Sequence, residues 1–301
     1  MKQEEKHMKV GVIGAGTMGS GIAQTFAQCP DVEKVYLCDI KEEFAERGKG
    51  KIKKALDKRV ARGKMTQEEV DQILGKITTG LNTICIDPDL IVEASIEDME
   101  SKKNVFRELQ YQIVRNPKCI YATNSSSLSI TEIGAGLPSP CIGMHFFNPA
   151  PAMKLVEVIA GINTYQKTVD RIKKISEMLG KTPVQVDAAP GFVDNRILIQ
   201  MINEAIFVYS EGIAKIRDID IAMKLGCNHP MGPLELGDYI GLDIVLAILE
   251  TIYHDTGDSK YRPAPLLRKM VRGNKLGVKS GVGFYDYADG QKVPVDEEAV
   301  I

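Results

Sequence analysis

Apolar and polar positions alternate in two ways along the first part of the chain. Short apolar runs predict buried strands, whereas apolar residues three and four positions apart predict helices. The runs that predict strands are 8–13, 32–38, 89–94, 119–123, 141–146, 154–159 and 182–186. The segments that predict helices are 20–28, 42–62, 66–74, about 99–114, 129–135 and 164–179. Strands that alternate with helices predict an α/β domain with a mostly parallel sheet.

The pattern changes at residues 187–191, Asp-Ala-Ala-Pro-Gly, which we interpret as a linker. Beyond it almost every segment has helical spacing, and several are apolar on more than one face, as in cores and interfaces. We therefore predict two domains, 1–189 and 190–301, the second all-α and forming a homodimer or higher homo-oligomer. The expected helices are 193–211, 216–225, 233–256 with breaks near Gly237 and Gly241, and 266–272, followed by a loop and a short extended piece at 277–287.

A glycine-rich turn follows the first predicted strand: Gly14, Ala15, Gly16, Thr17, Met18 and Gly19. The next strand ends at Asp39. The order along the chain is a strand, the Gly-x-Gly-x-x-Gly turn, a helix, a second strand and an acidic residue. This order predicts a Rossmann-type dinucleotide-binding unit, in which the phosphates lie at the helix N-terminus. A carboxylate at position 39 accepts hydrogen bonds from ribose hydroxyls and repels a 2′-phosphate, which favours NAD over NADP. Lys41 nearby weakens that preference.

A basic helical hairpin, residues 42–62 and 66–74, interrupts the alternation. Thr66 and Glu69 form a capping-box pattern at the start of its second helix. In the first helix Lys54, Lys58 and Arg62 share one face because they are four positions apart. Two interpretations stay open from the spacing: a solvated helix face, or an anion clamp for a substrate that carries phosphates.

Composition and charge argue against several classes of protein and of binding partner. The formal net charge of −2 gives no sign of a nucleic-acid or anionic-membrane partner. No apolar run is long enough for a membrane span, and residues 1–7 do not resemble a signal peptide. The six cysteines include no CxxC pair, so we expect reduced thiols in a cytoplasmic protein. The spacing of the residues supports neither a two-histidine metal site nor a Ser-His-Asp triad, so neither a metal site nor a hydrolase is expected. We interpret His229 and His254 as structural.

His145 and Glu157 carry the chemistry we expect. They stand on two strand-like runs joined by an Asn-Pro-Ala-Pro turn, so a hairpin places the carboxylate beside the imidazole. Such a pair is a general acid/base, and next to NAD it predicts hydride transfer coupled to proton transfer. Ser126 and Asn195 are candidate neutral donors to a carbonyl oxygen. The alternatives are that Ser126 caps the next helix and that Asn195 makes a helix-start or interhelix contact.

Several longer motifs resemble the 3-hydroxyacyl-CoA dehydrogenase family over about residues 8–287. They are Gly-Ala-Gly-Thr-Met-Gly-Ser-Gly-Ile-Ala-Gln, Asn-Ser-Ser-Ser-Leu-Ser-Ile, Met-His-Phe-Phe-Asn-Pro-Ala-Pro, Met-Lys-Leu-Val-Glu-Val-Ile, Pro-Gly-Phe-Val-Asp-Asn-Arg and His-Pro-Met-Gly-Pro-Leu-Glu-Leu-Gly-Asp. The chain is most similar to the bacterial short-chain members. The resemblance implies a Rossmann-type domain, a helical domain that forms a homo-oligomer, and NAD-linked interconversion of (S)-3-hydroxyacyl-CoA and 3-oxoacyl-CoA.

The resemblance also implies roles for individual residues. His145 matches the catalytic base and Glu157 its partner, while Ser126 and Asn195 match residues at the reacting end of the substrate. The further positions implied are Asp39 for the ribose, Glu97, Lys102, Asn148 and Lys279 for the nicotinamide half of NAD, and Lys58 and Arg62, on the face shared with Lys54, for CoA.

Some positions depart from the family pattern. Asp194 replaces an apolar residue beside Asn195, and Ala55 stands where some relatives have a CoA-contacting serine. Two alternatives to this function are that the protein is an NAD dehydrogenase of another hydroxy acid, or that it is a non-catalytic, structural relative of the family. The basic helix argues against the first because such substrates lack the phosphates of CoA. The His145 and Glu157 pair argues against the second.

Overall fold

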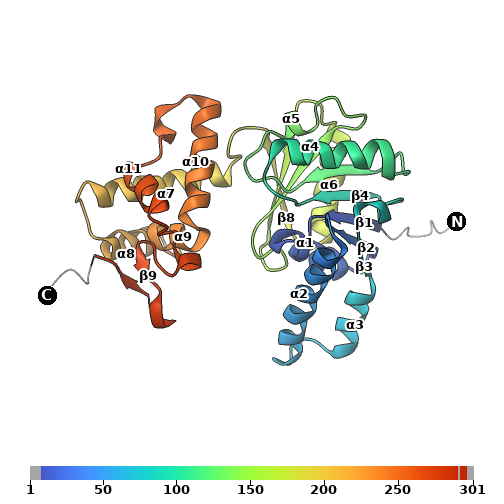
Figure 1. The fold of residues 1–301 in the computed structure, drawn as a ribbon, viewed down its shortest axis with the longest axis horizontal. Coiled ribbons are helices and arrows are strands. Elements are labelled where there is room, and N and C mark those ends of the chain that lie inside the picture. Colours follow the sequence, from blue (N-terminus) through green and yellow to red (C-terminus); the bar gives the residue numbers. More distant parts are fainter. Residues whose placement is uncertain (1–7, 291, 297–301) are drawn as a thin grey trace. The chain divides into compact units, whose positions relative to one another are not determined.

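The computed structural model of the chain describes residues 8–290 and 292–296 (Figure 1). The chain forms two compact units that divide between Ala189 and Pro190. Residues 1–7, where the sequence suggested no signal peptide, lie outside the described part. Within that part, no helix has both the length and the apolar character needed to cross a membrane.

The first unit is built on an eight-stranded sheet with the spatial order β3-β2-β1-β4-β5-β6-β7-β8. The strands from β3 to β6 pair in parallel, β7 is antiparallel to β6, and β8 is parallel to β7. The predicted mostly parallel sheet is therefore confirmed. Its strands are β1 (Met8–Ile13), β2 (Val32–Cys38), β3 (Ile77–Gly80), β4 (Leu90–Glu93), β5 (Ile120–Thr123), β6 (Cys141–Phe146), β7 (Leu155–Ala160) and β8 (Thr182–Asp187).

The sequence pattern missed strand β3. Its four residues, Ile-Thr-Thr-Gly, contain a single large apolar side chain, and only the first and last are buried. The strand forms because it pairs in parallel with Val35–Cys38 of β2 at the edge of the sheet. An edge strand with few apolar residues has no apolar run for pattern analysis to detect.

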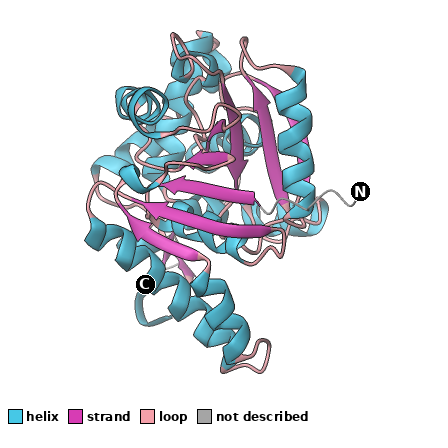
Figure 2. Cartoon of the chain, turned by 90° about the vertical axis from the view of Figure 1, so that its right-hand side faces the viewer, coloured by secondary structure: helices cyan, strands magenta, loops and turns pink. Residues whose placement is uncertain are grey.

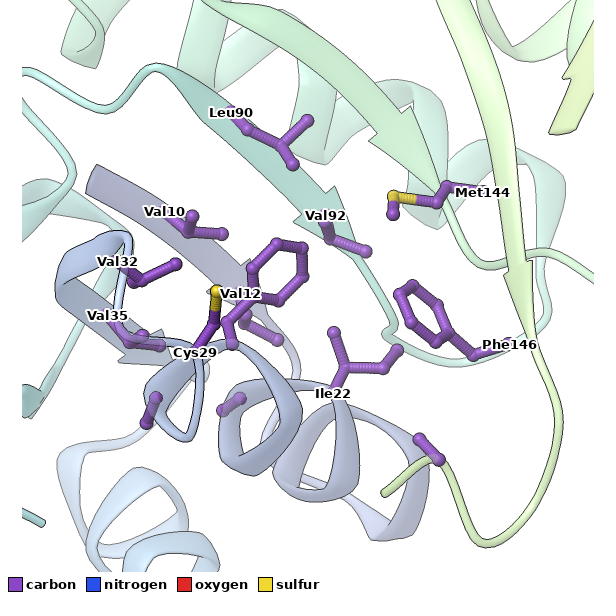
Figure 3. Close-up of a cluster of buried hydrophobic side chains, with 14 of the residues drawn as sticks. Val10, Val12, Ile22, Cys29, Val32, Val35, Leu90, Val92, Met144 and Phe146 are labelled. Carbon is purple, nitrogen blue, oxygen red and sulfur yellow. The ribbon is translucent and has the colours of Figure 1, made fainter. Parts of the chain in front are cut away.

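Helices cover both faces of this sheet, as Figure 2 shows with helices in cyan and strands in magenta. Apolar residues of α1, α2 and α6 pack with Val10, Val12 and Leu90 in one buried cluster, part of which Figure 3 shows. Residues of α4 and α5 pack on the other face with Ile13 and Ile91. The helices are α1 (Thr17–Ala27), α2 (Glu42–Val60), α3 (Gln67–Gly75), α4 (Met99–Glu108), α5 (Ile130–Ile133) and α6 (Gln166–Met178), with a 3-10 turn η1 (Asn82–Ile84).

Several helix boundaries differ from the predictions. Helix α1 begins at Thr17, inside the glycine motif, rather than at Ser20. Helix α2 continues through Gly48, where a Cβ would lie 2.9 Å from the Cβ of Ala15, so this glycine lets α2 approach the glycine loop. Helix α4 ends at Glu108 and continues as a π-turn, η2 (Leu109–Ile113), instead of remaining α-helical to Val114. The α2–α3 hairpin and its Thr66–Glu69 capping box are as predicted.

The second unit is helical apart from a short two-stranded ladder. The predicted break at Gly237 is wrong because this residue lies inside α9, and the chain turns only at Gly241, whose φ is 105°. The helices of this unit are α7 (Asp194–Ser210), α8 (Ile216–Gly226), α9 (Pro233–Ile240), α10 (Leu242–Thr256) and α11 (Pro265–Arg272). A 3-10 turn, η3 (Ser259–Tyr261), lies between α10 and α11. After α11 come η4 (Val278–Ser280), β9 (Tyr285–Asp286), η5 (Ala288–Gly290) and β10 (Val293–Pro294).

Two buried aspartates organise the glycine-rich tail of this unit. Asp220 accepts hydrogen bonds from the backbone of Leu234 at 2.8 Å, at the start of α9, and from the Tyr285 hydroxyl at 2.7 Å. Asp238 accepts from the backbone N–H groups of Phe284 and Tyr285 at 3.0 and 2.9 Å. Gly232 is required in the His-Pro-Met-Gly-Pro motif because a Cβ there would lie 2.3 Å from the Asp220 side chain. This motif is therefore structural within its own unit.

Burial raises the pKa of Asp238 to about 6, in spite of hydrogen bonds from Phe284, Tyr285 and Tyr287 that favour its charged form. A carboxyl whose pKa is raised on folding binds its proton more tightly in the folded state, so its contribution to stability is lost as pH rises through about 6. Compared with Asp238→Asn, the wild-type protein should gain about 1–2 kcal/mol of unfolding free energy between pH 7 and pH 5. Urea denaturation at both pH values measures the difference, and equal changes in the two proteins would contradict it.

Candidate active site

His145 and Glu157 lie directly opposite each other in the antiparallel register of β6 and β7. Opposed residues point to the same face of a sheet, and Nδ1 of His145 lies 2.9 Å from Oε2 of Glu157. The two residues are 6 % and 1 % exposed. The imidazole also contacts the ring of Phe147, with the centroids 4.6 Å apart. The hairpin thus produces the juxtaposition expected from the sequence.

The connection between β6 and β7 carries the Asn-Pro-Ala-Pro turn, which lies against α1. A Cβ at Gly21 would lie 3.3 Å from the Cβ of Ala150 and 3.4 Å from Cδ of Pro151. Asn148 is exposed, and its peptide bond to Pro149 is cis. The turn that follows His145 is therefore packed beside the helix that follows the glycine loop.

A buried ion-pair network supports the loop after β5. Lys102 is 1 % exposed, and its ammonium lies 2.9 Å from both carboxylate oxygens of Glu93 and 3.3 Å from Oε2 of Glu97. Glu93 ends β4 and also accepts a 2.6 Å hydrogen bond from the Thr123 hydroxyl at the end of β5. The network therefore joins two neighbouring strand ends to helix α4.

Glu97 fixes the serine loop. Its Oε1 accepts hydrogen bonds from the Ser125 hydroxyl at 2.6 Å, from the Ser126 backbone at 2.8 Å and from the Ser127 backbone at 3.0 Å. Burial opposes its charge, but the Lys102 ammonium and these hydrogen bonds together lower the pKa of Glu97 below its ordinary value. Helix α5 is capped by Ser129 rather than by Ser126, so the structure does not support the capping alternative for Ser126.

The glycine loop has the features that a dinucleotide requires. Gly14 has a φ of 97°, and a Cβ on Gly19 would lie 1.7 Å from the carbonyl oxygen of Gly14, so neither position accepts a side chain. At Gly16 a Cβ would meet no atom within 4 Å. Helix α1 begins there without a side-chain cap, which leaves its first N–H groups without partners inside the helix. The open space and the uncapped helix terminus fit a pyrophosphate.

Asp39, which follows β2, is hydrogen-bonded to the backbone of this loop. Its carboxylate accepts the backbone N–H of Ala15 at 2.7 Å and that of Ile40 at 2.8 Å. Each carboxylate oxygen has a further lone pair, so the same group can also accept ribose hydroxyls. Because β1, β2, β4, β5 and β6 are parallel, their carboxyl ends bring this loop, Glu93, the serine loop and His145 to one edge of the sheet, where open α/β sheets bind ligands.

A groove of about 480 Å³ lies between α1, α2 and the turn at 148–152. From α2 it is lined by Lys51, Ala55 and Arg59, which are four positions apart, and by Ile52. The predicted cations Lys54 and Lys58 are exposed on the same helix. The predicted helix end at Arg62 is wrong, because α2 ends at Val60 and Arg62 lies in the turn that follows it. None of these three cations lines the groove. Lys54 precedes Ala55 by one position, which turns its side chain by about 100° around the helix axis.

The remaining predicted residues belong to the second unit. Asn195 is buried in the first turn of α7, after Asp194, an acid that suits a helix N-terminus. Lys279 lies in η4, where its ammonium forms a 2.6 Å contact with Asp243. Their roles stay predictions.

Sequence reasoning missed Glu93, Lys51 and Arg59. Glu93 had a local signal, because a carboxylate ends the otherwise apolar run Leu-Ile-Val-Glu and implies a buried partner. Lys51 and Arg59 had none, because which face of α2 borders the groove depends on how the helix packs.

One edge of the sheet thus carries the glycine loop, the Asp39 carboxylate and the contact between His145 and Glu157. This combination is typical of a Rossmann-type, nicotinamide-dependent dehydrogenase. Sequence comparison gives the family. The NAD binding domain of 3-hydroxyacyl-CoA dehydrogenase matches residues 9–189, and the C-terminal domain of the same enzyme matches residues 191–287. The chain belongs to the 3-hydroxyacyl-CoA dehydrogenase family, and its cofactor is NAD.

Curated relatives and solved structures agree with this assignment. The chain is 51 % identical over 283 residues to 3-hydroxybutyryl-CoA dehydrogenase of Clostridioides difficile, covering 93 % of this chain and 99 % of the relative. It is 51 % identical over 284 residues to the probable 3-hydroxybutyryl-CoA dehydrogenase of Deinococcus radiodurans, covering 93 % and 100 %. The crystal structure of (S)-3-hydroxybutyryl-CoA dehydrogenase from Ralstonia eutropha superposes with a TM-score of 0.87 at 41 % identity, covering 94 % and 99 %.

Proposed function

We propose that the protein interconverts (S)-3-hydroxybutyryl-CoA and acetoacetyl-CoA, with NAD as hydride carrier and the His145–Glu157 pair as acid and base. The observation that carries this proposal is the 2.9 Å contact between the two side chains at the sheet edge that holds the glycine loop. In the cell we expect mainly reduction of acetoacetyl-CoA. The similarity to enzymes named for this substrate supports the choice of a four-carbon acyl chain.

The chemistry of the pair follows from its geometry. Glu157 accepts a hydrogen bond from Nδ1 of His145, which assigns proton exchange with the substrate to Nε2. In oxidation Nε2 takes the proton of the 3-hydroxyl group, and the buried carboxylate stabilises the imidazolium that forms. In reduction Nε2 returns this proton to the 3-oxo oxygen. When bound, NAD supplies the carbon that accepts or donates the hydride.

Neutral donors complete the proposed site. The Ser126 hydroxyl, on a loop that Glu97 holds in place, can donate to the 3-oxygen without adding charge. We assign the Asn195 amide the same task, on the strength of the family resemblance. Glu97, Lys102, Asn148 and Lys279 remain our proposed nicotinamide-side residues.

The acyl-CoA fits the groove beside α2. The groove reaches from Thr17 and Gly21 of α1 to Asn148, and its cations Lys51 and Arg59 suit the phosphates of CoA. The double variant Lys51→Ala/Arg59→Ala should raise KM for acetoacetyl-CoA about 10- to 100-fold, because hydrogen bonds to charged groups contribute about 1.5–3 kcal/mol. KM for NADH should stay within about twofold, since Asp39 and the glycine loop bind that cofactor.

The matched comparison is Lys58→Ala/Arg62→Ala, which removes the same charge from the last turn of α2 and from the turn that follows it. A larger rise in KM with this pair would place the phosphates on the face predicted from the sequence. No rise with either pair would leave α2 a solvated helix.

Oxidation of NADH at saturating concentration, followed at 340 nm with acetoacetyl-CoA, tests the function itself. Free acetoacetate and NADPH serve as comparison substrates. Turnover with acetoacetyl-CoA and NADH supports the proposal. Turnover only with free oxo acids favours the hydroxy-acid alternative, and no turnover with any substrate favours a non-catalytic relative.

We also propose that the second unit forms a homo-oligomer. Several apolar side chains on its helices are exposed within the chain, among them Ile197 on α7, Tyr239 on α9 and Ile244 on α10. Exposed apolar groups of this kind are typical of interfaces. The cytoplasm remains the expected compartment, since all six cysteines are free thiols and five of them are buried.

A further inference from the structure

Lys181 is a buried lysine with no role in the chemistry described above. It is 7 % exposed, and its Nζ donates hydrogen bonds to the carbonyl oxygens of Ala150 at 2.6 Å and of Met153 at 2.7 Å. Among the described residues no carboxylate pairs with it. Burial, with a smaller effect of the Lys154 ammonium, lowers the pKa of Lys181. Burying an ammonium without a counter-ion is unfavourable, so the two carbonyl contacts must compensate for it.

The backbone on both sides of Lys181 is anchored. Helix α6 ends in a turn where Gly180, with a φ of 70°, donates to the carbonyl of Glu177 and Lys181 donates to that of Ser176 at 2.9 Å. The next residue, Thr182, starts β8 and bonds to the carbonyl of Lys154 at 2.7 Å. A side chain that leaves a fixed backbone has few alternative positions, so its two acceptors are held in place as well.

Both acceptors belong to the turn that forms a wall of the groove. Asn148, Ala150 and Ala152 line the groove, and Ala150 is 2 % exposed. The turn has internal hydrogen bonds from the N–H groups of Ala152 and Met153 to the carbonyl of Pro149, at 2.9 and 3.0 Å. The Lys181 ammonium adds a contact from a segment 31 residues away in sequence.

We propose that Lys181 is a positioning residue, which sets the place of the Asn148–Met153 turn and thereby the shape of the acyl-CoA groove. This inference rests on the proposed function of the groove. A residue that only stabilises the fold would change the fraction of active protein, and so the apparent kcat. A residue that positions the turn changes how well the groove fits the thioester, and so KM for that substrate.

The test compares Lys181→Met with Lys154→Met in the full-length protein. Methionine keeps most of the length of the side chain and removes the donors. Lys154 is an exposed lysine beside the start of β7, so its variant loses the same charge without the two carbonyl contacts. We expect KM for acetoacetyl-CoA to rise about tenfold in Lys181→Met, with KM for NADH within about twofold of wild type, and both constants unchanged in Lys154→Met.

An unchanged KM for acetoacetyl-CoA in Lys181→Met, with a fall in kcat alone, would overturn the inference. So would an equal rise in both KM values, or the same rise in Lys154→Met. If Lys181→Met does not yield folded protein, Lys181→Gln, which removes the charge but keeps an amide NH₂ group as donor, is judged by the same criterion. Wild-type protein that does not turn over acetoacetyl-CoA contradicts the proposed function instead, and the wild-type assay therefore comes first.

Discussion

Replacing His145 with glutamine is expected to lower kcat for acetoacetyl-CoA reduction by about 10²- to 10⁴-fold, the range that general acid–base catalysis contributes. Glutamine occupies a similar volume but cannot take a proton from the 3-hydroxyl group or return one to the 3-oxo oxygen. NADH affinity should be unchanged, because the glycine loop and Asp39 lie on other strands. Steady-state kinetics and NADH fluorescence titration measure the two quantities.

His254→Gln is the matched control for this substitution. The His254 side chain is 90 % exposed on the second unit and contacts only Asp255 among the described residues, so kcat should not change. A kcat for His145→Gln close to wild type would remove His145 from the mechanism. A fall in both variants would show that the loss is not specific to the pair.

Removing the Lys102 ammonium is expected to destabilise the first unit by about 3–5 kcal/mol, the usual effect of breaking a buried ion pair. In Lys102→Met the buried carboxylate of Glu93 loses both of its 2.9 Å contacts, and Glu97 loses its cation. The pKa of Glu97 should rise for the same reason, since the Lys102 charge is the largest contribution that lowers it. Chemical denaturation, with CD and NADH binding as readouts, measures the loss.

Lys103→Met, one position further along α4, is the control. Lys103 makes surface ion pairs with Glu132 and Glu100, and such pairs contribute little, so its denaturation midpoint should change little. The double variant Glu93→Gln/Lys102→Met should recover part of the lost stability, because it removes the unpaired buried charge. Equal losses in Lys102→Met and Lys103→Met would show that the network does not hold the strand ends together.

Much of the fold could be predicted from the local pattern of apolar and polar residues. Fully buried strands such as β4 and β6 are apolar on both faces and appear as continuous runs, so their positions were predicted within one or two residues. Strand β3 was missed because its two central residues are threonines and its pairing with β2, not its own pattern, makes it a strand. Gly237 shows the same limit, since this glycine suggested a break but lies inside helix α9.

The candidate site likewise contains residues that could be predicted from local sequence pattern and residues that could not. His145 and Glu157 were paired from the sequence because a single hairpin joins them, and the register of β6 and β7 then leaves little choice. The dinucleotide loop was predicted because its conformational requirements lie within six consecutive residues, Gly14 to Gly19. Lys54, Lys58 and Arg62 have the spacing of one helix face, but α2 ends at Val60. Spacing also does not say which face borders a groove, and Lys51 and Arg59 line it instead.

The sequence by itself therefore determined the class of fold, the nicotinamide cofactor and the pairing of His145 with Glu157, because each depends on residues that are close in the chain or joined by one turn. Tertiary structure decided how these parts are supported. Glu97 reaches Ser125 across 28 residues, Lys181 reaches Ala150 across 31, and Asp238 reaches Phe284 across 46. Such contacts have no periodic signature in the sequence. They exist because packing of the sheet and its helices buries polar groups, which must then find partners wherever the fold brings them.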